Sequence, residues 1–129
     1  HSIGCTASFT QVAGIEAIEG PQEQVDIVVA EYQRRRDVLV AGLNSIPGMR
    51  CQTPQGAFYV FPNIKSFGLP SKEIARRLMD EAGVAVLAGT DFGHYGEGYL
   101  RLCYATAPEM IDHALELMAD FFARLEPRK

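Results

Sequence analysis

The chain has 129 residues, of which 47% are apolar and 22% are charged, proportions typical of one globular domain or of a piece of a larger one. They exclude collagen-like, low-complexity and disordered classes. The net charge of −4 argues against non-specific nucleic acid binding, which requires a basic surface. No apolar run approaches the roughly 18 residues of a membrane-spanning helix, so we expect neither a nucleic acid nor a membrane as partner.

The cysteines and the first residues indicate the setting of the protein. Cys5, Cys51 and Cys103 are an odd number, without the spacing of a metal site or a disulfide framework, which favours a reducing cytoplasm. The three histidines are scattered and predict no metal site. The chain opens His-Ser-Ile-Gly, with no initiator methionine and no secretion signal. We therefore expect it to be part of a longer protein.

Two helices are predicted before the first strand. Residues 1–8 are small and polar and predict a loop or an extended lead-in, and apolar spacing predicts a short helix over 9–18. Apolar residues three and four positions apart then predict one long helix over 21–46, about 38 Å in length, which suits a connection to another part of a larger protein. Within it, the arginine run 34–36 predicts a solvated helix face, the alternative being a phosphate-binding or nucleic-acid-binding patch.

The rest of the chain mixes strands and helices. Ser71 and Thr106 are the predicted N-cap residues of the two later helices. The order predicts an α+β fold (α/β layered), a small three-stranded sheet covered by helices. The predicted elements are a strand at 57–61, a helix at 71–82, a strand at 84–87, a glycine-rich loop at 88–98, a strand at 99–105 and a helix after 107.

Arg101 lies in the middle of a predicted strand. Strand side chains alternate, so Arg101 faces away from Leu100 and Leu102. A guanidinium stays charged, and a buried one needs an anion. That anion is either a protein carboxylate in a structural ion pair or the carboxylate or phosphate of a ligand, which arginine binds with two parallel hydrogen bonds. Both remain open, although the adjoining loop 88–98 adds weight to a ligand site because glycine-rich loops often form the wall of one.

Little else in the sequence indicates catalysis. The only lysines are Lys65, Lys72 and Lys129, and none occupies a position that predicts the desolvated surroundings of a Schiff-base nucleophile. Neither a phosphate-binding P-loop nor a G-x-S-x-G nucleophile motif is present. The residues therefore predict no catalytic group in this chain.

Three segments resemble one known family, the class I/II aminotransferases, which are pyridoxal-phosphate-dependent enzymes of fold type I. Residues 54–62 (PQGAFYVFP) resemble its "P-x-G-A-F-Y-x-F-P" segment. Residues 84–93 (VAVLAGTDFG) resemble "V-x-V-x-P-G-x-x-F-G", with Ala88 in place of the usual proline, and residues 96–105 (GEGYLRLCYA) resemble "G-E-G-Y-x-R-L-x-Y-A". Together with the upstream helices, the resemblance covers essentially the whole chain, and three motifs in the family's order make it specific.

The resemblance implies that the chain is the C-terminal part of such an enzyme. Residues 1–20 would lead in from a large domain, and residues 21–129 would form the small domain, with the long connecting helix 21–46. Of the site residues, it implies that Arg101 binds the substrate α-carboxylate. Gly56 and Phe58 would lie near the substrate pocket, and the loop 88–98 would form a mobile wall.

The resemblance further implies what the longer protein does. It would use pyridoxal 5'-phosphate, transfer an amino group from an amino acid to a 2-oxo acid, and form a homodimer. The family's cofactor lysine lies upstream in an "S-x-S-K"-type segment, so this chain is expected to hold no cofactor and to be inactive alone. Two alternatives stay open. One is another reaction of the same fold, a β-lyase or a cyclopropane-forming synthase, and the other is a stand-alone ligand-binding or dimerisation module. The amino donor is not indicated.

Overall fold

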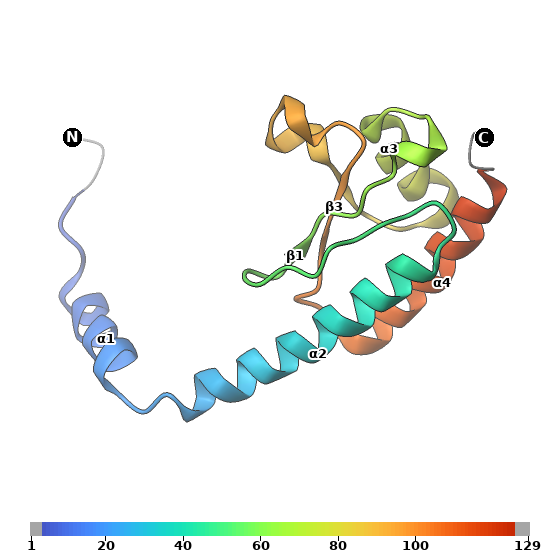
Figure 1. Cartoon of the computed structure of the whole chain (residues 1–129). Coiled ribbons are helices and arrows are strands. Elements are labelled where there is room, and N and C mark those ends of the chain that lie inside the picture. Colours follow the sequence, from blue (N-terminus) through green and yellow to red (C-terminus); the bar gives the residue numbers. More distant parts are fainter. Residues whose placement is uncertain (1–3, 126–129) are drawn as a thin grey trace. The chain divides into compact units, whose positions relative to one another are not determined.

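The computed structural model describes residues 4–125 of the chain (Figure 1). These residues divide into two compact units, one up to Glu31 and one from Tyr32 onward. Lys129 and the first three residues of the predicted lead-in lie outside the described residues. The predicted division into residues 1–20 and 21–129 stays a prediction.

The first unit is helical. Helix α1 (Ser8–Glu19) confirms the short helix expected there, and none of its residues is buried. Helix α2 (Glu23–Ser45) confirms the long helix and continues from the first unit into the second. Only the second half of α2 contributes buried side chains. The apolar residues Val25, Ile27, Val28 and Val29 of its first half are exposed.

The second unit contains the predicted three-stranded sheet, and its strands are antiparallel. Strand β3 (Leu100–Cys103) lies in the middle, between β1 (Tyr59–Val60) and β2 (Leu87–Ala88). This arrangement confirms the α+β prediction. The strands are shorter than the sequence predicted. The second one begins late because the backbone N–H of Val84 donates to the carbonyl of Leu78 and so completes the end of the preceding helix.

Two later helices cover the sheet, α3 (Ser71–Ala82) and α4 (Pro108–Arg124). The predicted end of α3 is confirmed, and Gly83 ends the helix with a left-handed φ of 70°. The predicted N-caps are wrong. Pro70 and Ala107 hold those positions and neither forms a side-chain cap hydrogen bond. Thr106 lies outside α4, and Ser71 is the first residue of α3, where its own N–H needs an acceptor.

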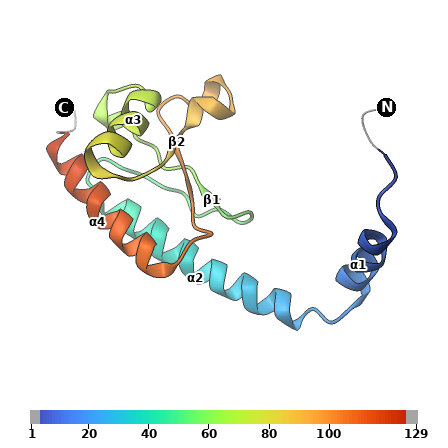
Figure 2. The ribbon, with the colours of Figure 1, turned by 180° about the vertical axis from the view of Figure 1, so that it is seen from behind.

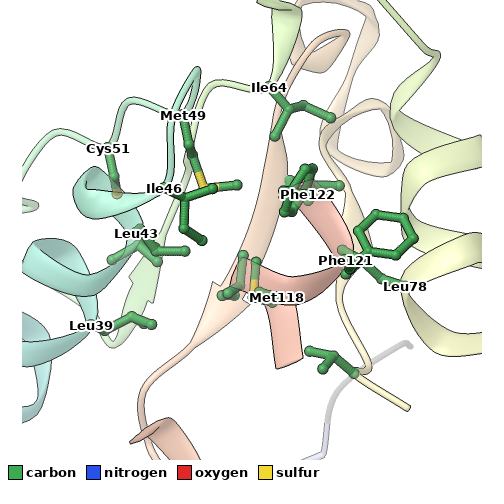
Figure 3. Close-up of a cluster of buried hydrophobic side chains, with 14 of the residues drawn as sticks. Leu39, Leu43, Ile46, Met49, Cys51, Ile64, Leu78, Met118, Phe121 and Phe122 are labelled. Atoms are coloured by element: carbon green, nitrogen blue, oxygen red, sulfur yellow. The ribbon is translucent and has the colours of Figure 1, made fainter. Parts of the chain in front are cut away.

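The core lies between the sheet and the helices. Helix α4 lies beside the second half of α2 in both views (Figures 1 and 2), and Gly42 allows this approach because a Cβ there would overlap the Leu115 side chain. Figure 3 shows Met118 and Phe122 of α4 between the α2 side and the α3 side of the cluster. The inner face of the sheet is buried against it, through Val60, Leu100, Leu102 and Tyr104. These side chains close one face of the sheet completely.

The glycine-rich segment between β2 and β3 is ordered as two short 3-10 helices, η2 (Gly89–Phe92) and η3 (His94–Gly96). A Cβ at Gly96 would overlap the backbone of Gly89, so the two turns pack backbone against backbone.

None of the helices within residues 4–125 is both long and apolar enough to cross a membrane.

Candidate functional site

The sheet face opposite the core carries Arg101. The register places Leu87 opposite Arg101 and Tyr59 opposite Cys103, so these four side chains project from the same face. Leu87 is 45% exposed, and Phe61, the residue directly after β1, is 40% exposed. We call this surface the outer face, formed by Tyr59, Phe61, Leu87, Tyr99, Arg101 and Cys103.

The Arg101 guanidinium lies between two aromatic rings. Its Cζ atom is 3.8 Å from the centroid of the Phe92 ring and 4.2 Å from that of Tyr59. Such cation–π contacts stabilise a guanidinium by about 0.5–2 kcal/mol each, depending on exposure. Phe92 is in turn held edge-on against Phe61, with 5.9 Å between ring centroids. Residues from β1 and η2 therefore surround the guanidinium that β3 carries.

Arg101 forms no ion pair with any carboxylate in the described part of the chain. The structural ion pair that the sequence left open is thus not formed there. The sequence reasoning also treated Arg101 as an inward residue. It is only half-buried, because β3 is central but its outer face is not covered by the described residues. A guanidinium that stacks through its flat sides keeps its edge, with the N–H donors, for another acceptor.

Phe58 is connected to Arg101 indirectly. Its ring centroid lies 4.5 Å from that of Tyr59, whose ring contacts the guanidinium. Gly56 is exposed, and a Cβ at this position would meet no atom within 4 Å. The structure thus connects Phe58 to Arg101 through Tyr59, whereas Gly56 lies in an open, exposed position. Their assignment to the substrate pocket remains a prediction.

The turn that carries Phe58 has an unusual backbone. Ala57 has a φ of 60°, a left-handed backbone conformation that residues other than glycine rarely adopt. Tyr104 holds it: its hydroxyl donates to the Ala57 carbonyl at 2.8 Å, and its backbone N–H donates to the Phe58 carbonyl at 3.0 Å. Burial raises the pKa of the Tyr104 phenol and so favours the protonated donor. Sequence reasoning gave neither residue this role, because nothing in an alanine signals a positive φ and the Tyr104 hydroxyl reaches a residue 47 positions away.

An open hollow of about 670 Å³ adjoins the outer face. Tyr59, Phe61 and Tyr99 form one side of it, and Arg50 and Asn63 contribute polar groups. The side-chain amide of Asn63 donates to the Tyr99 hydroxyl at 3.4 Å. Hollows of some 300–1,000 Å³ are typical of small-molecule sites.

The described residues do not fit a covalent site for an aldehyde cofactor. Lys65 is exposed, with Nζ 5.0 Å from the Tyr99 ring centroid. The Lys72 side chain is 73% exposed, with Nζ 3.8 Å from Asp91 Oδ1. A Schiff-base lysine requires a desolvated pocket, which neither has. The same residues contain no cluster of three or more histidine, cysteine, aspartate or glutamate side chains that could hold a metal ion.

Comparisons with known proteins agree with the sequence motifs. The profile of the family described as "Aminotransferase class I and II" matches residues 1–118. Aspartate aminotransferase of Pyrococcus horikoshii is 44% identical over 117 residues, which cover 89% of this chain and 30% of that protein. Aromatic-amino-acid aminotransferase 2 of Thermococcus litoralis is 41% identical over 120 residues, covering 92% and 31%. The structure of aspartate aminotransferase from Rhizobium meliloti superposes with a TM-score of 0.89 at 32% identity, covering 97% of this chain and 33% of that one.

The chain therefore belongs to the class I and II aminotransferase family. It spans about 30% of the length of the curated relatives it matches. Enzymes of this family act on amino acids and 2-oxo acids with pyridoxal phosphate as cofactor, and they are usually dimers.

Proposed function

We propose that the chain is the C-terminal part of a pyridoxal-phosphate-dependent aminotransferase and that Arg101 binds the α-carboxylate of the substrate. The observation that carries this proposal is the guanidinium stacked between Phe92 and Tyr59 with no carboxylate partner among residues 4–125. Within the longer protein, residues 1–20 lead in from the large domain. Residues 21–129 form the small domain, and residues 21–46 connect the two.

The geometry suits a carboxylate. Contacts with two rings restrict the movement of the guanidinium and reduce its contact with water. The free edge then offers parallel N–H donors to both oxygens of a substrate carboxylate, a pairing that fixes orientation as well as affinity. Holding a substrate by its carboxylate aims the remaining bonds of the α-carbon in one direction, and such orientation is a large share of what an enzyme contributes.

The described residues supply no group for covalent binding of the cofactor, so we place the chemical step outside them and infer that this chain alone is inactive. The longer protein is proposed to form a homodimer. A cytoplasmic location is supported by the three cysteines, all of which are free.

The test uses the longer protein. Arg101→Ala is expected to lower kcat/KM for the amino acid by about 30- to 1,000-fold, the range for losing one partner of a hydrogen-bonded charge pair, roughly 2–4 kcal/mol. Arg101→Lys keeps the charge without the planar fork and is expected to recover only part of the loss. Arg76→Ala, which removes an exposed arginine on α3, is the control.

An Arg101→Ala protein with kinetics within twofold of the unaltered protein would contradict the proposal. The reaction itself is identified from its products. Amino-group transfer requires a 2-oxo acid acceptor, whereas a β-lyase or a cyclopropane-forming reaction proceeds without one.

A further inference from the structure

Glu97 lies at the end of the loop that precedes β3. Its carboxylate accepts three hydrogen bonds although the side chain reaches the surface. Glu97 Oε1 accepts from the backbone N–H of Ser71 at 2.9 Å, from that of Gly98 at 3.1 Å and from the Ser71 hydroxyl at 3.2 Å. These bonds, the Ser71 backbone N–H first among them, lower the pKa of Glu97. The carboxylate is therefore ionised near neutral pH, and bonds to an ionised acceptor are about twice as strong as neutral ones.

Ser71 completes the arrangement from the other side. It is fully buried, and its hydroxyl oxygen accepts from the backbone N–H groups of Gly98 at 2.8 Å and Tyr99 at 3.2 Å. All the hydrogen-bonding capacity of the hydroxyl is used. We call Ser71, Glu97 and Gly98 the latch.

The latch provides the hydrogen-bond acceptor for the first backbone N–H of α3. Pro70 provides no side-chain cap, so the first N–H of the helix depends on Glu97, a residue 26 positions away in the chain. An anion at a helix N-terminus is favoured by the helix dipole. The consequence is that α3, which is part of the core, holds one end of the loop.

The latch also fixes the start of the strand that carries Arg101. Gly98 is buried with a φ of 81°, and the Lys65 side chain occupies the space that a Cβ at this position would need. The Gly98 carbonyl accepts from the Ile64 N–H at 2.8 Å, which connects the start of β3 to the segment that follows β1. At the far end of the loop, the Gly89 N–H donates to the Tyr99 carbonyl at 2.8 Å. Between these two attachments lies Phe92, which stacks on Arg101.

We propose that Glu97 is a positioning residue, which through Ser71 holds the loop with Phe92 and the start of β3 in the arrangement that presents the edge of Arg101 to a substrate carboxylate. This inference rests on the proposed function of Arg101. It assigns to Glu97 no contact with the substrate.

The experiment compares variants of the longer protein. Glu97→Ala removes all three acceptor bonds, and Glu97→Gln keeps an acceptor oxygen without the charge. Glu109→Ala is the matched control, because Glu109 is also an exposed glutamate beside a helix N-terminus, that of α4. Steady-state kinetics give KM and kcat for the amino acid, and hydrogen exchange gives the protection of the Gly98 and Tyr99 amides.

We expect Glu97→Ala to raise KM about 5- to 30-fold and to lower kcat by a smaller factor, because the variant loosens the residue that holds the substrate carboxylate and removes no group that reacts. Exchange at Gly98 and Tyr99 is expected to rise about 10-fold or more. Glu97→Gln is expected to restore KM to within about threefold, and Glu109→Ala to leave both readouts unchanged. If Glu97→Ala does not fold, Glu97→Asp, which keeps the charge on a side chain one methylene shorter, is expected to show the same KM rise.

Two results would overturn the inference: unchanged exchange at Gly98 and Tyr99, or a lowered Tm with unchanged KM, the signature of a helix cap alone. Failure of the proposed function is distinct. If Arg101→Ala has no effect on kcat/KM, the carboxylate assignment itself is wrong, whereas an effect of Arg101→Ala without one of Glu97→Ala overturns the role of Glu97 alone.

Discussion

The two faces of the sheet have opposite surroundings although they are built by the same short strands. On the inner face, Val60 and Leu100 are 1% and 0% exposed, packed against side chains of the surrounding helices. On the outer face, Phe61 and Leu87 are 40% and 45% exposed and flank a half-buried arginine. Strand alternation thus separates a packed face from an exposed face within one strand. Within residues 4–125, side chains of the chain itself cover one face of the sheet and leave the other exposed.

Replacing a leucine on each face tests the comparison with the largest expected effect. Leu100→Ala removes a fully buried side chain and is expected to lower the free energy of unfolding of the chain by about 2–5 kcal/mol. Leu87→Ala, its counterpart on the outer face, is expected to change it by about 0.5 kcal/mol. Urea unfolding followed by circular dichroism measures both. Equal losses at the two positions would mean that the outer face is packed as tightly as the inner one.

Thiol reactivity sharpens the comparison without altering the sequence. Burial raises the pKa of the Cys51 thiol from 9.0 to about 11, against a smaller lowering by a hydrogen bond to the Phe61 backbone. At neutral pH this shift reduces the reactive thiolate about 100-fold. Cys103, on the outer face, is exposed. A chromogenic disulfide reagent is expected to label Cys103 and Cys5 rapidly and Cys51 only after unfolding. Fast labelling of all three cysteines in the folded chain would contradict the burial of Cys51.

The smallest predicted effect concerns the edge of the outer face. Ala88 replaces the proline of the family motif, yet its φ is −67°, the angle that proline imposes. The Gly89–Tyr99 pair is hydrogen-bonded, so the neighbouring Ala88–Leu100 pair is of the non-hydrogen-bonded type. A proline at position 88 therefore removes no hydrogen bond between β2 and β3. Ala88→Pro is expected to stabilise the chain by about 0.4–1 kcal/mol in urea unfolding. A loss of stability would show that the N–H of Ala88 has a partner.

Local patterns predicted the helices well. The apolar spacing from Ser71 and the glycine after Ala82 sufficed for α3, since both signals lie within the helix or directly after it. The strands were predicted too long, because pairing depends on partners distant in the chain. The caps were missed for the same reason: the acceptor for the first N–H of α3 is Glu97, outside the helix. The sequence signal for Glu97 was an acidic residue between two glycines in the motif of residues 96–105, which indicates no contact with α3.

Long-range contacts also account for what the sequence did not predict about the arginines. The arginine run of α2 was predicted to be a solvated face, yet Arg35 Nη1 donates to the Thr106 carbonyl at 2.7 Å and Arg36 Nη1 to the Pro54 carbonyl at 3.3 Å. At the candidate site, strand alternation separated Arg101 from its buried neighbours and the family motif gave it a role. Neither indicated the stacking on Phe92, because that contact joins a loop to a strand.

The central claim is that Arg101 recognises a carboxylate, and one measurement addresses it directly. In the longer protein, the inhibition constant of a 2-hydroxy acid matched to the substrate is compared with that of its primary amide, before and after Arg101→Ala. The acid is expected to bind about 30-fold or more tightly than the amide to the unaltered protein, and this preference is expected to vanish in the variant. Undiminished preference for the acid in Arg101→Ala would contradict the claim.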